Sequence, residues 1–84
     1  MTTSAQISVY PLRQEHLGPA VESVRGALEE HGLTPQVGPM STTVTGASGI
    51  VFAALAEAFA KAATTGQLVM TITISNACPL RADP

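Results

Sequence analysis

The hydrophobic pattern of this chain switches repeatedly between a period of two and a helical period, with glycine or proline beside most of the switches. Residues 5–12 alternate between apolar and polar side chains, which is typical of a half-buried strand. The next segment has apolar residues at helical spacing, at Leu17, Val21, Val24 and Leu28. Pro19 suits the first turn of this helix, and Gly32 suits the left-handed position after its last turn. This switching constrains the fold more than any single motif.

Two short extended segments follow the first helix. Residues 33–38 predict an edge strand, because Pro35 removes a backbone donor from the sheet. Gly38 and Pro39 turn the chain, and residues 40–46 then run back as a further strand. A β-hairpin therefore joins the two halves of the sequence.

The second half ends with another helix and another strand. Ser48 is the expected N-cap of the helix. The helix is expected to bury Val51, Phe52, Leu55 and Phe59. Gly66 ends it, and the β-forming run after this glycine predicts the last strand.

The order β-α-β-β-α-β predicts an α+β fold, the ferredoxin-like sandwich, with an antiparallel sheet in the order 4-1-3-2 and both helices on one face. A length of 84 residues predicts one domain, residues 1–84. The expected strands lie at about 4–12, 33–38, 40–46 and 67–76, and the expected helices at about 15–31 and 49–64.

Strand parity predicts that the sheet face away from the helices is polar but carries no charge. If Ile7, Val44 and Ile72 face the helices, the opposite face carries Gln6, Ser8, Tyr10, Ser41, Thr43, Thr45, Thr71, Thr73 and Ser75. Exposed sheet faces usually carry lysine, glutamate and arginine. The pattern therefore indicates that a second subunit or a small neutral or cationic ligand covers this face, although plain solvent exposure also fits.

Composition narrows the classes of partner. Net charge is −2, and the basic residues are scattered, at Arg13, Arg25, Lys61 and Arg81. Without a basic patch, we expect no binding to nucleic acid. The chain has neither a signal-peptide pattern nor an apolar run long enough to span a bilayer, so we expect a cytoplasmic protein without membrane insertion.

No catalytic or metal-binding constellation is evident. Cys78 has no base placed beside it by the pattern, because His16 and His31 flank the first helix instead. Cys78 is either a small buried residue or a ligand contact. The spacing of histidine and cysteine matches no metal motif. We therefore expect a protein that is not an enzyme and that has no metal site.

The chain resembles the YkoF-like family of thiamine- and hydroxymethylpyrimidine-binding proteins over about residues 4 to 80. The stretches that carry the resemblance are "SAQISVYPL" (4–12) with "EHLGPAV" (15–21), "VGPMST" (37–42) and "ISNACP" (74–79). The resemblance implies the same fold and a role in salvage, transport or handling of vitamin B1. It also implies a homodimer or dimer of dimers that pairs through the sheet face.

The implied ligand is thiamine or its hydroxymethylpyrimidine moiety, with no separate cofactor. An aminopyrimidine offers ring-nitrogen acceptors and an amine donor, which amides and hydroxyls can match without charge. Phe52 or Phe59 could stack on the ring, as could a tyrosine. The expected ligand-binding residues are Gln6, Ser8, Tyr10, Met40, Ser41, Thr42, Ser75 and Asn76.

Two questions stay open at the level of sequence. Asn76 either contacts the ligand or only caps the strand end by bonding to its own backbone. The stretches "SNACP" and "GPMST" also belong at opposite ends of the first strand, so they share a pocket only along the sheet or across a dimer. The alternative function is a structural or regulatory oligomerisation module without a small ligand. An enzyme acting on a pyrimidine is a third possibility, which the missing acid–base pair disfavours.

Overall fold

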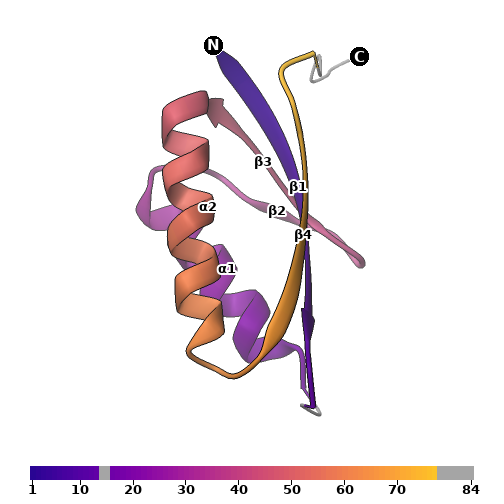
Figure 1. Ribbon diagram of the computed structural model, residues 1–84. Coiled ribbons are helices and arrows are strands. Elements are labelled where there is room, and N and C mark those ends of the chain that lie inside the picture. Colours follow the sequence, from indigo (N-terminus) through magenta and orange to yellow (C-terminus); the bar gives the residue numbers. More distant parts are fainter. Residues whose placement is uncertain (14–15, 78–84) are drawn as a thin grey trace.

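The structure is a computed structural model of the 84-residue chain, and it describes residues 1–13 and 16–77. It has the predicted element order (Figure 1). The elements are β1 (Thr2–Pro11), α1 (Gly18–Glu30), β2 (Gln36–Val37), β3 (Thr42–Ala47), α2 (Ser48–Ala63) and β4 (Leu68–Ser75). Cys78, for which the sequence left two interpretations, lies outside the described residues.

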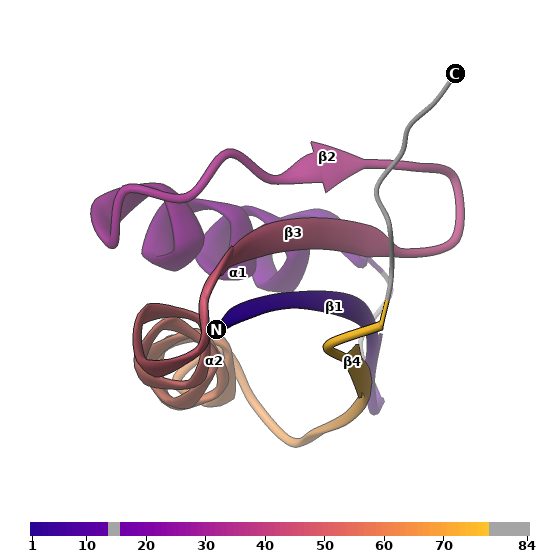
Figure 2. The ribbon, with the colours of Figure 1, turned by 90° about the horizontal axis from the view of Figure 1, so that it is seen from above.

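The sheet confirms the predicted ferredoxin-like topology. Its order is β2-β3-β1-β4, and every neighbouring pair is antiparallel. Both helices lie on the same side of the sheet, which leaves the other face open (Figures 1 and 2). The predicted parity is also confirmed: Ile7 pairs with Ile72 on the helix side, and Gln6 pairs with Thr43 and Thr73 on the open face.

The core lies between the helices and the strands β1 and β3. Small side chains dominate it, and alanines let α1 and α2 approach each other closely. Its members are Ala5, Ile7, Val24, Ala27, Leu28, Leu33, Val44, Val51, Ala54, Leu55, Ala58 and Ala62. No helix of the described part of the chain is long and apolar enough to cross a membrane.

Several predicted boundaries were too generous. The helix α1 begins at Gly18, with Leu17 as an exposed N-cap residue, rather than near residue 15. Pro19 does lie in its first turn, and Gly32 takes the expected left-handed conformation, with φ of 81°. The strand β2 has only two residues, because the chain before Pro35 buries Leu33 in the core instead of pairing in the sheet.

The two flanks of α2 differ in chemistry. The sequence predicted Val51, Phe52, Leu55 and Phe59 as buried, but only Val51 and Leu55 are. Phe52 and Phe59 are 56% and 49% exposed on the flank next to β4, where Ile72 and Ile74 are also more than a third exposed. Because β4 is an edge strand and α2 covers mainly β1 and β3, the helix side of β4 is thinly covered.

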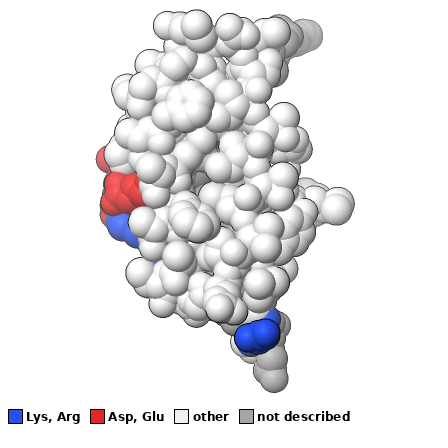
Figure 3. All heavy atoms as spheres, viewed as in Figure 1, with Lys and Arg blue, Asp and Glu red and all other residues white. Residues whose placement is uncertain are grey.

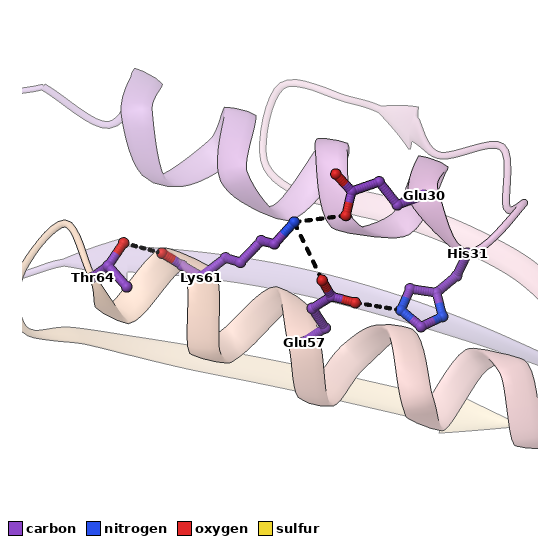
Figure 4. Close-up of polar contacts among 5 residues, drawn as sticks. All are labelled: Glu30, His31, Glu57, Lys61 and Thr64. Carbon is purple, nitrogen blue, oxygen red and sulfur yellow. Dashed lines mark hydrogen bonds and ion pairs between the residues drawn. The ribbon is translucent and has the colours of Figure 1, made fainter.

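The other flank of α2 carries charges that link it to α1 (Figure 4). Lys61 Nζ lies 2.6 Å from Glu30 Oε1 and 3.2 Å from Glu57 Oε2, and Glu57 Oε1 lies 2.5 Å from His31 Nε2. Hydrogen bonds from His31 and then Lys61 lower the pKa of Glu57 below its ordinary value of 4.5. We call these four residues the interhelix charge cluster.

Candidate functional site

The open face of the sheet carries hydroxyl and amide side chains, some of which pair across the strands β1 and β3. Ser4 Oγ and Thr45 Oγ1 lie 3.0 Å apart across β1 and β3, and Gln6 Nε2 donates to Ser41 Oγ at 3.1 Å. On the β4 side, Thr71 and Thr73 make no side-chain hydrogen bond to another described residue. The uncharged hydroxyl groups of this face can therefore still form hydrogen bonds with a ligand or a subunit that covers it.

Charge is sparse on the side of the molecule shown in Figure 3, where acidic and basic side chains appear only at one flank and at the lower end. This view looks across α2 and the edge strand β4. An anionic group bound over this side would therefore find few cationic partners.

One cleft lies on the helix side of the sheet, where β1 begins, α2 begins and β4 ends. We call it the end cleft. Its volume is about 540 Å³, and it opens broadly to solvent. Its lining residues are Met1, Thr3, Ser48, Phe52, Ile74, Ser75 and Asn76.

Hydroxyl groups form the floor of the end cleft. Thr3 is almost fully buried, and its Oγ1 lies 2.5 Å from Ser48 Oγ. Ser48 Oγ also donates to the carbonyl of Met1 at 3.1 Å, and the backbone N–H of Ser48 donates to the same carbonyl at 2.9 Å. The prediction of Ser48 as the helix N-cap was wrong: Ala47 holds that position, and the Ser48 side chain joins α2 to β1 instead.

The rim of the end cleft combines an amide with an aromatic ring. Within the described residues, Asn76 Nδ2 makes one side-chain contact, to Met1 Sδ at 3.6 Å, which is a weak acceptor. Ser75 Oγ accepts a hydrogen bond from the Ala77 N–H at 3.0 Å and so caps the strand end. The Cys78 N–H, which a backbone cap by Asn76 would use, lies outside the described residues. The exposed ring of Phe52 lines the same cleft. An amide, hydroxyls and an aromatic face are thus brought together without a charged side chain.

A second, smaller cleft lies at the opposite end of β1. We call it the hairpin cleft, because the β2–β3 hairpin and the first turns of α1 enclose it. Its volume is about 90 Å³. Its lining residues are Ile7, Ser8, Val9, Leu17, Val21, Val24, Val37, Gly38, Pro39, Met40, Ser41 and Thr42.

The structure divides the eight predicted ligand-binding residues among three places. Ser75 and Asn76 line the end cleft, and Ser8, Met40, Ser41 and Thr42 line the hairpin cleft. Gln6 and Tyr10 lie on the open face and line neither cleft. Gln6 bonds to Ser41, and Tyr10 pairs with Val69 at the end of β1 away from the end cleft. One chain does not gather the eight into a single pocket.

Met1, Thr3 and Ser48 were missed by the sequence reasoning, although they form the end cleft with predicted residues. No local sequence pattern marks them, because they meet only through the pairing of Thr2 with Ala47, which brings the start of β1 to the start of α2. Within the described part of the chain, no group of three or more histidine, cysteine, aspartate or glutamate residues could hold a metal ion.

Several solved structures share this fold. A Streptococcus pneumoniae protein matches with a TM-score of 0.82 and 23% identity, over 95% of this chain and 90% of its own. A Methanocaldococcus jannaschii hypothetical protein matches at 0.80 and 19%, over 99% and 84%. A Thermotoga maritima protein, provisionally described as a thiamine biosynthesis or salvage protein, matches at 0.77 and 20%, over 88% and 82%.

The fold is that of a small α+β protein of the ferredoxin-like class, and these solved structures share it. A search of curated proteins finds no significant match. Residues 5–77 match the sequence profile of the family described as thiamine-binding proteins, and the chain belongs to that family. The description is that of a binding protein rather than an enzyme.

Proposed function

We propose that this protein binds thiamine or its hydroxymethylpyrimidine moiety in the end cleft, and acts in salvage, transport or handling of vitamin B1 in the cytoplasm. The observation that carries the proposal is the composition of this cleft. In a chain of the thiamine-binding family, the cleft brings together an exposed aromatic ring, hydroxyl groups and an amide whose one bond within the described residues is weak. Its volume of about 540 Å³ lies in the range usual for small-molecule sites.

The Asn76 amide supports recognition of the pyrimidine half. A 4-aminopyrimidine presents an amine donor next to a ring-nitrogen acceptor, and a side-chain amide can pair with such an edge through two hydrogen bonds, as it does with adenine. The weak contact to Met1 Sδ leaves the Asn76 amide available for this exchange. Ser75 Oγ, which already accepts from Ala77, can donate a further hydrogen bond.

Phe52 supports recognition of the ring plane. Its side chain is 56% exposed at the cleft, where burial against a planar ligand would remove apolar area from water. An aromatic face also attracts a cation, which suits the thiazolium of thiamine. No lysine or arginine lines the end cleft, so no basic side chain there would pair with a diphosphate. We therefore expect the unphosphorylated compounds to bind more tightly than thiamine diphosphate.

Calorimetric titration of the purified chain with thiamine, hydroxymethylpyrimidine and thiamine diphosphate tests this proposal. We expect saturable binding of an unphosphorylated compound with a micromolar or lower Kd, and weaker binding of the diphosphate. Absence of heat with all three, from a protein whose circular dichroism shows it to be folded, would remove the proposal.

The open face supports a second candidate function, that of an assembly module. Its hydroxyl groups lack charged neighbours, and those of Thr71 and Thr73 make no bond within the described residues. A second copy laid over this face, in a homodimer or dimer of dimers, would give these groups partners. Light scattering across a dilution series tests the assembly: a dimer or tetramer supports it, and a monomer at every concentration contradicts it.

A further inference from the structure

The two hydroxyl groups on the floor of the end cleft form a chain of hydrogen bonds that ends on a backbone carbonyl. Thr3 Oγ1 lies 2.5 Å from Ser48 Oγ, and Ser48 Oγ donates to the Met1 carbonyl oxygen at 3.1 Å. The backbone N–H of Ser48 donates to the same oxygen at 2.9 Å. A carbonyl oxygen has two lone pairs and no proton, so these two bonds use its whole capacity.

This carbonyl sets the direction of every proton in the chain. A serine hydroxyl carries one proton, and Ser48 gives it to the Met1 carbonyl, because two oxygens with no proton between them would repel each other. Ser48 Oγ can then only accept from Thr3 Oγ1, which commits the single proton of Thr3. Both hydroxyls keep lone pairs, but neither keeps a free proton. Toward a ligand, the floor of the end cleft can therefore only accept hydrogen bonds.

The amide at the rim has no such fixed polarity. The side chain of Asn76 presents a carbonyl on one side and an NH₂ group on the other, and a half-turn of the amide exchanges the two. Its one bond within the described residues, to Met1 Sδ at 3.6 Å, is too weak to hold one orientation. Asn76 can thus pair with the edge of an amino-substituted ring or of an oxo-substituted ring, whereas the floor cannot adapt.

Thr3 lies where a mismatch with the ligand is costly. It lines the end cleft but is only 3% exposed, and it belongs to the same row of β1 as the buried Ala5 and Ile7. Water has little access to such a position. A ligand acceptor placed against this floor would lose its hydrogen bond to water and gain none in return.

We propose that this floor makes the end cleft selective for rings that carry an exocyclic amine over rings of the same shape that carry a carbonyl at that position. The inference rests on the proposed function, because it concerns the ligand of the same cleft. An amine has two N–H groups, so one can pair with Asn76 and the other with the floor. A carbonyl oxygen can accept from Asn76, but at the floor it meets only the lone pairs of Thr3 and Ser48.

Hydroxymethylpyrimidine and its 4-oxo counterpart are matched probes, because replacing the amine by a carbonyl hardly changes the shape of the ring. In calorimetric titrations, the amine compound should bind roughly tenfold more tightly, since the carbonyl is left unpaired at the floor. Equal affinity of the two compounds would overturn this inference and leave the proposed function intact. If neither compound binds, the proposed function fails and this inference fails with it.

Substitutions connect the preference to the direction of the chain. Ser48→Ala removes the acceptor of Thr3, whose proton can then turn to the ligand, so the preference for the amine should largely vanish. Ser48→Thr keeps the hydroxyl and should keep the preference. In Asn76→Ala, both compounds should lose affinity by the same factor. Ser4→Ala breaks the hydroxyl pair with Thr45 on the open face, and as the control it should leave the preference unchanged.

Three results would contradict the proposal. A Ser48→Ala protein that is folded by circular dichroism and keeps the full preference would show that the floor does not set it. Loss of the preference in Asn76→Ala would mean that the amide distinguishes the two compounds and the hydroxyl chain does not. Loss of the preference in Ser4→Ala would place the ligand over the open face of the sheet.

Discussion

The two clefts differ in how their polar groups are used. In the end cleft the buried hydroxyl of Thr3 is already bonded, and the groups left available, Asn76 and Phe52, lie at an exposed rim. The hairpin cleft is lined by both apolar and hydroxyl side chains, and one of the latter, Thr42, is buried. The first arrangement suits a planar ligand held by its face and edge, whereas the second leaves much less room.

The difference arises from the helices above the sheet. Near the end cleft, α2 leaves the helix side of β4 thinly covered, so a broad opening remains beside Ile74. Near the hairpin cleft, α1 packs over β1 with Val21 and Val24, and only a narrow space is left. The same sheet thus offers a wide site at one end and a narrow one at the other.

The largest expected effect comes from Phe52. Phe52→Ala should weaken binding of hydroxymethylpyrimidine by about 1–3 kcal/mol, the range measured for stacking of a base on an aromatic ring. Phe59→Ala is the matched control, since Phe59 lies on the same flank of α2 with similar exposure but outside the end cleft. Calorimetry should find a loss of affinity in Phe52→Ala alone, and equal losses in both variants would contradict the placement of the ligand.

A somewhat smaller effect is expected from Asn76. Asn76→Ala should cost about 1–2 kcal/mol of binding free energy, because an exposed amide gives up two hydrogen bonds to the aminopyrimidine edge. Gln6→Ala removes an amide from the open face and serves as the control. If Gln6→Ala weakens binding and Asn76→Ala does not, the ligand lies over the open face of the sheet.

Removing the Ser48 hydroxyl from the floor of the end cleft should also affect stability. Ser48→Ala leaves the buried hydroxyl of Thr3 unpaired and should lower the free energy of unfolding by about 1 kcal/mol. The double variant Thr3→Val with Ser48→Ala removes both partners and should recover part of that loss. Urea unfolding measures both, and a double variant less stable than the sum of the two single changes would show that the pair is not the cause.

The smallest effect concerns pH and the interhelix charge cluster, which contacts neither cleft. Folding lowers the pKa of Glu57, so its contribution to stability is present above its ordinary pKa of 4.5 and is lost as pH falls through the lower folded value. Glu57→Gln should therefore flatten the acid side of the curve of stability against pH. Glu22 is a comparison: Arg25 lowers its pKa in the same direction, but within α1 alone. An unchanged acid side in Glu57→Gln would contradict this assignment.

The fold was predictable because local signals and strand parity agree. The glycines at 32 and 66 mark helix ends, and alternation in β1 and β4 assigns each residue to a face. The flank of α2 was not predictable in the same way. Helical periodicity predicts that Phe52 and Phe59 are buried, but α2 is offset from the edge strand β4 and both remain exposed. Phe52 lines the end cleft and Phe59 lies outside it.

The candidate site was predictable only in part. Ser75 and Asn76 stood out because small hydrogen-bonding residues end an otherwise β-forming run. Thr3 and Ser48 lie 45 positions apart, and their contact depends on the register between β1 and β3, which no local pattern specifies. The burial of Thr42 likewise depends on its packing partners rather than on its neighbours in sequence.

Mapping of the bound ligand by NMR tests the central claim most directly. When hydroxymethylpyrimidine is titrated into ¹⁵N-labelled protein, we predict the largest shifts for the side-chain amide of Asn76 and the backbone amides of Ser48 and Phe52, with few changes at residues 37–42. Shifts concentrated on Gln6, Thr43, Thr71 and Thr73 of the open face, with the end cleft unaffected, would contradict the account.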